Sequence, residues 1–314
     1  MATFVVRRLI LGIFVIAIVS VVVFLFIQIV PGDPLVAMLG QQATREQLEA
    51  LRKELWLDRP IIVQYGHWLS NAVRGDLGHS ITLHDDVATL IAARLPVSLH
   101  LAVLAFIIGN ILGIAAGIIC AIRRGGIIDS VVTLLANLGI AVPIFLLGML
   151  CIYYFSLKLG WLPVQGYTSP FTDFWRSTKQ VILPVLCLSI PAIAVLARQT
   201  RSSMLEVVRQ DYIRTARSKG LRERLIISKH ALKNALIPIV TLMGLNVSVL
   251  IGGQVLIETV FNIPGMGRLI AEGAINKDII LVQGCAMLIA MIVVLVNLSV
   301  DLTYGWLDPR IRYD

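Results

Sequence analysis

Long uninterrupted runs of apolar residues constrain this chain more than any other feature. Six such runs occur, each about 18 residues or longer, which is enough to cross ~30 Å of bilayer hydrocarbon as a helix. To within a few residues they cover 9–30, 98–121, 131–157, 181–198, 237–260 and 279–303. Because helices satisfy their backbone hydrogen bonds within the segment, they are the form expected in lipid. The sequence therefore predicts an all-α polytopic membrane protein with six transmembrane helices.

Composition agrees with this class. The chain is 57% hydrophobic and 15% charged, whereas soluble domains have about 45–50% apolar and about 25% charged residues. The net charge of +8 does not indicate nucleic acid as a partner, because in a membrane protein the placement of charge matters more than its sum. The first apolar run is longer than the core of a typical signal peptide, so we expect a retained span. All cysteines lie inside apolar runs, which predicts buried apolar side chains rather than disulfides or metal ligands; they are Cys120, Cys151, Cys187 and Cys285.

The distribution of Lys and Arg predicts the orientation. Ten basic residues lie between Arg198 and Lys233, and placing this stretch inside puts both termini in the cytoplasm. The third run contains Pro143. We interpret it as one helix kinked at the proline, because two separate spans there would place the basic stretch outside.

The outer loop at about 31–97 is too long and too patterned for a simple linker. Thr44 and Gln47 form a capping-box pattern, and a second helix is predicted at 61–73. A turn at 75–78 and a third helix starting at Asp85 or Asp86 and ending at Arg94 complete a small, mainly helical external cap.

A polar segment at 198–238 lies between the fourth and fifth runs and reads RQTRSSMLEVVRQDYIRTARSKGLRERLIISKHALKNALIP. Its pattern over 205–219 predicts an amphipathic helix whose apolar face contains Leu205, Val208, Tyr212, Thr215 and Ala216. Gly220 is predicted to end this helix in left-handed geometry, and a second helix follows from about Arg222 into the fifth span. From the residues alone, two roles remain open: docking to a cytoplasmic partner, or contact with anionic lipid.

This segment resembles the cytoplasmic loop of binding-protein-dependent ABC importer permeases, whose pattern is Glu-Ala-Ala, three residues, Gly, nine residues, then Ile-x-Leu-Pro. Arg214-Thr215-Ala216 occupy the first three places, and Gly220 and Leu232 fall at the required spacings. Arg214, His230 and Lys233 replace the usual Glu, Ile and Pro.

Further motifs are similar to the dipeptide, oligopeptide and nickel branch of that family along the whole chain. They are TARSKG, KHALKNALIP, IVPGDP, LWLDRPIIVQYGHWL, GDLGHSI, ETVFNIPGMGRL and LDPRIRY.

The resemblance implies a type I ABC importer permease fold and half of a translocation pathway for di- and oligopeptides. The implied partners are a second homologous permease, two cytoplasmic ABC ATPase subunits and an extracytoplasmic solute-binding protein. The implied location is the inner membrane of a bacterium or archaeon. ATPase coupling is implied for the cytoplasmic coupling loop at 199–236, and within it for Asp211, Tyr212, Arg214, Thr215, Ala216, Arg217, Gly220, Leu221, His230, Leu232 and Asn234.

Catalytic and cofactor sites are not expected in this chain. It has no GxxxxGK[ST] sequence, so ATP and magnesium are expected in the partner ATPases and not here. The histidines of the outer loop match no metal-ligand spacing, so no metal site is expected. Candidates for the pathway or its gate are Glu258, an acidic group in an apolar run, and the loop residues Pro264, Gly265 and Gly267.

Alternatives to peptide import remain at this point. Within the same machine, the cargo could be a nickel chelate or glutathione. From other classes, an ATP-independent carrier or channel would have no need of the basic loop, and a membrane enzyme would need a catalytic motif such as HExxH or GxSxG, neither of which occurs.

Overall fold

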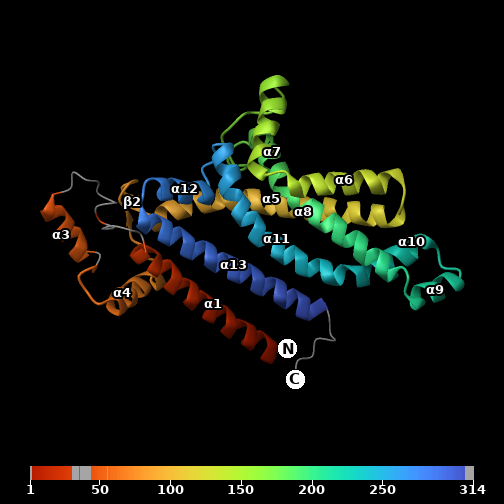
Figure 1. The fold of residues 1–314 in the computed structure, drawn as a ribbon, viewed down its shortest axis with the longest axis horizontal. Coiled ribbons are helices and arrows are strands. Elements are labelled where there is room, and N and C mark those ends of the chain that lie inside the picture. The colour runs from red at the N-terminus through yellow and green to blue at the C-terminus, as the bar shows by residue number, and fades with distance from the viewer. Residues whose placement is uncertain (1, 30–34, 36–43, 55, 308–314) are drawn as a thin grey trace. The chain divides into compact units, whose positions relative to one another are not determined.

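The computed structural model describes residues 2–29, 35, 44–54 and 56–307, and these residues are mainly helical (Figure 1). The first half of the chain contains α1 (Ala2–Ile29), α3 (Arg45–Glu54), α4 (Ile61–Val73), β1 (His79–Ser80), β2 (Asp85–Asp86), α5 (Val87–Ile122), α6 (Ile127–Ala141), α7 (Ile144–Cys151) and the π-helical η1 (Ile152–Lys158). The second half contains α8 (Phe174–Val207), α9 (Asp211–Ser218), α10 (Glu223–Leu225), the π-helical η2 (Ile226–Ala231), α11 (Leu232–Val260), α12 (Met266–Ile275) and α13 (Ile279–Leu307). The motif residues at 30–34, 55 and 308–313 lie outside the described part of the chain.

Five helices in the described residues are long and apolar enough to cross a membrane, and a bent pair of helices makes a sixth candidate. The five apolar stretches are Val6–Leu25, Val87–Ile122, Phe174–Val207, Pro238–Val260 and Ile279–Val300. The membrane-spanning character predicted from the apolar runs is therefore present in the fold.

The third apolar run is bent more sharply than a kinked helix. The helices Ile127–Ala141 and Ile144–Lys158 meet at 107°. Val142 is extended, with φ −79° and ψ 124°, because the ring of the following proline disfavours helical geometry at the residue before it. Pro143 then precedes α7 without an amide hydrogen of its own. The expected kink is thus a complete break between two helices.

The chain divides into two compact units. The first contains Leu99–Ile263 together with Met1–Val5 and Val296–Asp314, and the second contains Val6–Ser98 and Pro264–Leu295. Each unit has its own packing, and the two are described separately below.

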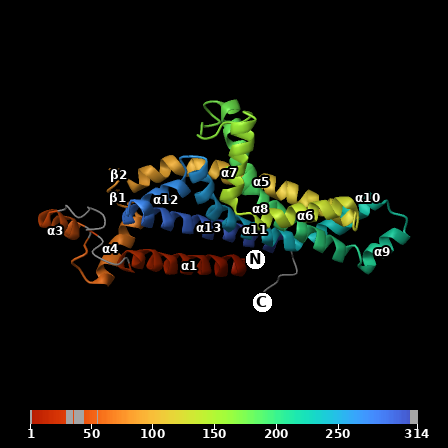
Figure 2. The same ribbon diagram turned by 45° about the horizontal axis from the view of Figure 1, so that its top comes forward.

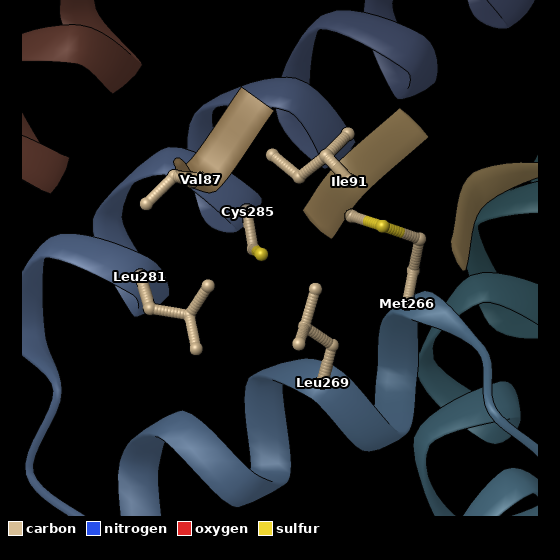
Figure 3. Packing of buried hydrophobic residues seen from close by; sticks show 6 residues of the cluster. All are labelled: Val87, Ile91, Met266, Leu269, Leu281 and Cys285. Carbon is tan, nitrogen blue, oxygen red and sulfur yellow. The ribbon is translucent and has the colours of Figure 1, made fainter. Parts of the chain in front are cut away.

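In the second unit, α5, α12 and α13 share a small apolar core (Figure 3). Its buried residues are Val87, Ile91, Met266, Leu269, Leu281 and Cys285. The helix α12 was not predicted from the sequence, where Pro264, Gly265 and Gly267 were expected in a loop. Met266 N–H donates to Ser98 Oγ at 2.7 Å, which satisfies one of the unpaired donors at the start of that helix.

The external cap is partly as predicted. Thr44 N–H donates to Gln47 Oε1 at 3.0 Å, and Gln47 N–H donates to Thr44 Oγ1 at 3.3 Å, so the capping box is confirmed. Gly75 and Gly78 both have positive φ, as the predicted turn requires.

The prediction of a separate third cap helix ending at Arg94 was wrong. The helix α5 starts at Val87 and continues through Pro96 to Ile122. A proline removes only one helical hydrogen bond, and membrane helices tolerate that loss. A two-stranded hairpin, with His79 opposite Asp86, precedes it.

In the first unit, α5 packs against α8 through a row of glycines. Added Cβ atoms at Gly109, Gly113 and Gly117 would lie 3.1, 2.8 and 2.5 Å from Cβ atoms of α8. Small residues at this four-residue spacing let helix backbones approach closely. The four cysteines of the chain are all buried, as predicted.

Candidate functional site

The coupling loop at 199–236 contains the end of α8, the short helices α9 and α10, and the start of α11. In both views α9 and α10 lie beyond the ends of α8 and α11 (Figures 1 and 2). The predicted single helix over 205–219 was wrong, because α8 ends at Val207 and α9 begins only at Asp211. Gln210 between them is extended, with φ −68° and ψ 149°. Asp211 in the first turn of α9 favours a new helix there, since acidic side chains stabilise helix N-termini.

The turn at Gly220 has the predicted left-handed geometry. Its φ is +74°, which a residue with a Cβ adopts only with strain. Gly220 N–H donates to Arg217 O at 2.9 Å and Leu221 N–H donates to Ala216 O at 3.3 Å, which closes the end of α9. The chain therefore reverses through a defined turn.

The loop has its own apolar core. The buried residues are Met204, Ile213, Ala216, Ile226, Ala231 and Ala235, contributed by α8, α9, η2 and α11. Of the predicted apolar face, Ala216 is buried, whereas Tyr212 and Thr215 are exposed. The reason is that α9 starts a new helix at Asp211, so its phase does not continue from Leu205. The loop therefore has a packed apolar interior of its own.

Polar contacts close the loop on its outer surface. Asn234 Nδ2 donates to Tyr212 Oη at 2.8 Å and to His230 O at 3.2 Å, which joins α9 to the start of α11. Arg217 donates to Glu223 through Nη2 at 2.6 Å and through Nε at 3.2 Å, across the Gly220 turn. This guanidinium lowers the pKa of Glu223.

Glu223 was missed by the sequence analysis. The available signal was a pair of opposite charges on either side of the turn-forming Gly220. Both side chains remain partly exposed, so the pair shapes the surface more than it stabilises the fold.

The other predicted coupling residues are distributed over this surface. Asp211 and Arg214 form an exposed pair at 3.5 Å. Thr215, Arg217 and Leu221 are also exposed, while His230 and Leu232 are half-buried. The loop thus presents a polar, cationic surface around a buried apolar centre.

The candidates for the pathway or its gate are largely buried within this chain. The Glu258 side chain is fully buried in the last turns of α11. The backbone carbonyl oxygen of Glu258 accepts from Ile263 N–H at 2.8 Å. Gly265 and Gly267 are buried at the start of α12. Pro264, Gly265 and Gly267 belong to the second unit and Glu258 to the first.

Two of the histidines, His79 and His100, have individual partners. His79 Nδ1 lies 3.1 Å from Asp86 Oδ1, and His100 Nδ1 lies 3.0 Å from Tyr167 Oη. Within the described residues, no group of three or more His, Cys, Asp or Glu side chains is arranged to hold a metal ion.

Comparison with known families gives two matches that together cover nearly the whole chain. Residues 113–313 match the family described as binding-protein-dependent transport system inner membrane component. Residues 1–102 match the N-terminal family of such membrane components.

Curated relatives match over the full length. A probable peptide ABC transporter permease of Sinorhizobium fredii is 42% identical, covering 100% of both chains. A putative peptide transport system permease of Brucella abortus is 44% identical, again over 100% of both. The glutathione transport system permease of Escherichia coli is 42% identical over 100% of both.

Solved structures share the fold at low identity. A chain of the MetNI methionine ABC transporter, in an inward-facing conformation, superposes with a TM-score of 0.54 at 17% identity. The match covers 70% of this chain and 96% of that chain. A chain of an amino acid ABC transporter crystallised with histidines gives a TM-score of 0.52 at 17% identity, covering 71% and 94%. The type I ABC importer permease fold predicted from the sequence is therefore confirmed.

Proposed function

The chain belongs to the family of binding-protein-dependent transport system inner membrane components, and from this premise we propose that it forms half of the translocation pathway of an ATP-driven peptide importer. A second homologous permease completes the pathway. Two cytoplasmic ATPase subunits drive it, and an extracytoplasmic solute-binding protein delivers the cargo. ATP and magnesium bind to the ATPases and not to this chain.

The geometry of the coupling loop carries the proposal. A loop with its own buried core and a closed turn at Gly220 transmits a displacement, whereas a loop without a core would absorb it. Its exposed surface is polar and cationic, which suits docking to a partner protein through charge and shape. Closure of the ATPases on ATP would draw the loops of the two permeases together and switch the pathway between outward-facing and inward-facing states.

The cargo is inferred from the full-length relatives. Relatives named as peptide permeases are 42% and 44% identical over whole chains, which supports di- and oligopeptides. Glutathione is the second candidate, because the Escherichia coli glutathione permease is 42% identical over the same length. The location we propose is the bacterial or archaeal inner membrane, with both termini in the cytoplasm.

The test is peptide uptake and ATP hydrolysis by the complex of this chain with its second permease, ATPases and binding protein in proteoliposomes. Gly220→Val forces a β-branched residue into left-handed geometry, and Arg217→Glu places two like charges side by side at the same turn. We expect both variants to lose ATP-driven uptake by about tenfold or more, since an element that transmits motion must keep its shape. Both should also bind the ATPases more weakly.

Gly160→Val is the matched control. Gly160 also has positive φ, +64°, with open space around it, but it lies in the opposite, outer loop. The Gly160→Val substitution introduces the same kind of backbone strain, but away from the proposed docking surface. Uptake should therefore change little. If the Gly220 and Arg217 variants kept full ATP-coupled uptake, docking through this loop would be refuted. If the wild-type chain took up peptide without ATPases, a carrier would be favoured instead.

A further inference from the structure

A charged pair joins two membrane helices close to the base of the coupling loop. Arg201 in α8 donates to Asp129 in the first turn of α6, from Nε to Oδ1 at 2.6 Å and from Nη2 to Oδ2 at 2.8 Å. Gly125 N–H donates to Asp129 Oδ2 at 3.0 Å. The carboxylate therefore accepts from a guanidinium and from the turn that precedes its own helix.

The Asp129 carboxylate is shielded from solvent, whereas the Arg201 side chain is partly exposed. Only 6% of the Asp129 side chain and 33% of the Arg201 side chain is exposed. A two-point contact between a planar guanidinium and a carboxylate fixes orientation as well as distance. Removal of Arg201 leaves the shielded Asp129 carboxylate without its counterion, which is unfavourable.

The helix that carries Arg201 is also held from its other side. A Cβ atom added at Gly117 of α5 would lie 2.6 Å from Ala197 O and 3.0 Å from Arg201 N. The α8 backbone at 197–201 is thus in close contact with α5, while its Arg201 side chain reaches α6. Since the coupling loop at 199–236 begins in this part of α8, which ends at Val207, this stretch is the base of that loop.

Further along α6, contact with α8 is apolar, and at Gly139 it is close, because an added Cβ there would lie 2.9 Å from Ile190 Cγ2. An apolar cavity of about 670 Å³ lies among α5, α6 and α8. Its lining extends along α6 from Ile128, next to Asp129, to Gly139, which is also where Ile190 of α8 meets α6. The Asp129–Arg201 pair is thus the charged, directional contact between the two helices at the end near the coupling loop.

We propose that Asp129 and Arg201 are positioning residues that make α6 move as one body with the base of the coupling loop. A displacement of the loop then reaches α6 and, through the break at Pro143, the rest of the third membrane segment. This inference rests on the proposed function, because it supplies the path by which ATPase movement would reach that segment.

The test uses the assembled importer and measures peptide taken up per ATP hydrolysed. The variants are Asp129→Asn, Arg201→Gln, Arg201→Lys and the exchanged pair Asp129→Arg with Arg201→Asp. Arg123→Gln is the matched control, because Arg123 is an exposed arginine at the end of α5 next to the same turn.

We expect both single neutral variants to lower uptake per ATP by about tenfold, a coupling change typical of residues that link two sites, while ATP hydrolysis itself continues. Arg201→Lys should fall between these variants and wild type, because it keeps the charge but loses the two-point contact. The exchanged pair should recover several-fold relative to either single variant, and the control should match wild type. A purely structural role would instead lower uptake and hydrolysis together, in proportion to the amount of assembled complex.

The proposal is overturned if Asp129→Asn and Arg201→Gln keep the wild-type ratio, or if uptake and hydrolysis fall in parallel. If the neutral variants do not assemble, Arg201→Lys decides the question. An unchanged ratio of peptide uptake to ATP hydrolysis in this variant overturns the proposal, and a lowered ratio supports it. Failure of the proposed function would be distinct, because the wild-type complex itself would then show no coupling. In that case deuterium exchange on the purified chain decides whether Arg201 holds α6, with faster exchange at 125–131 in Arg201→Gln supporting the contact and unchanged exchange refuting it.

Discussion

At the scale of single residues, Asp278 shows how one buried carboxylate ties together two parts of the second unit. It is 1% exposed and accepts from Ser80 Oγ at 2.6 Å, from Thr82 N–H at 3.0 Å and from Thr82 Oγ1 at 2.8 Å. Its other oxygen accepts from Leu281 N–H at 3.1 Å and caps α13. The hairpin that precedes α5 is thereby tied to the start of α13.

These contacts predict a pH dependence. Burial by itself raises the pKa of Asp278, but the hydrogen bonds from Ser80, Thr82 and Leu281 outweigh it, so the pKa is lowered from its ordinary value of 3.8. A lowered folded-state pKa stabilises the fold above the unfolded-state pKa, and this stabilisation is lost as pH falls through the folded-state pKa. Asp278→Asn should therefore destabilise the chain by about 1–3 kcal/mol at pH 7.

Thermal unfolding of the detergent-solubilised chain from pH 7 down to pH 3 measures this effect. The difference between Asp278→Asn and wild type should shrink at the acid end. Asp85→Asn, at an exposed position of the same hairpin, should leave the melting temperature unchanged. A constant difference across this pH range would contradict the assignment.

The glycines of α5 make a second prediction at this scale. A Cβ at Gly117 would lie 2.5 Å from the Thr200 Cβ and 2.6 Å from Ala197 O. Since a carbonyl oxygen of a packed helix cannot move aside easily, Gly117→Ala should destabilise the chain by about 1–3 kcal/mol, as overpacking does. Gly66→Ala, where no atom lies within 4 Å, should be neutral or stabilise α4 by up to about 1 kcal/mol. A melting temperature of Gly117→Ala at or above wild type would show that the helices separate freely.

At the scale of elements, the coupling loop is expected to fold as a local unit around its apolar core. Ile226 is fully buried in that core, whereas the neighbouring Leu225 is 42% exposed. Ile226→Ala should therefore cost about 2–5 kcal/mol of local stability, and Leu225→Ala much less. Deuterium exchange should rise over 199–236 in the first variant and stay unchanged in α5. Equal exchange in the two variants would mean that the loop has no core of its own.

The same elements show what could be predicted from the sequence. Gly220 and the Thr44–Gln47 capping box were predicted correctly, because each signal depends on neighbouring residues and on backbone geometry alone. The break at 208–210 was missed, since no glycine or proline marks it and Tyr212 continued an apparent apolar face. The helix α12 was also missed, because its start depends on a donor–acceptor contact with Ser98, far away in the chain.

The Asp129–Arg201 pair is another feature that could not be predicted from the sequence. The two residues lie in different helices, and only the tertiary packing of α6 on α8 brings them together. By contrast, the GxxxGxxxG spacing of Gly109, Gly113 and Gly117 was present in the sequence as a signal for close helix packing, and it was overlooked.

At the scale of the whole molecule, the break at Pro143 decides the topology. If the bent pair formed by α6, α7 and η1 crosses the membrane, the loop at 159–173 is outside and the coupling loop is inside. If the pair enters and returns on one side, the number of crossings changes by one, and both loops exchange sides. The ten basic residues between Arg198 and Lys233 favour the first arrangement.

Labelling of single introduced cysteines with a membrane-impermeant thiol reagent tests this topology. Phe171 is 99% exposed in the outer loop, and Lys219 is exposed in the coupling loop, while the four native cysteines are buried. Phe171→Cys should react in intact cells, and Lys219→Cys should react only in inverted membrane vesicles. Because the two loops flank a single membrane helix, α8, they must lie on opposite sides under either arrangement. The reverse pattern at both positions would contradict the predicted topology, either because the third apolar segment is re-entrant or because the N-terminus is outside. In both cases the loop assigned to the ATPases would lie outside the cell.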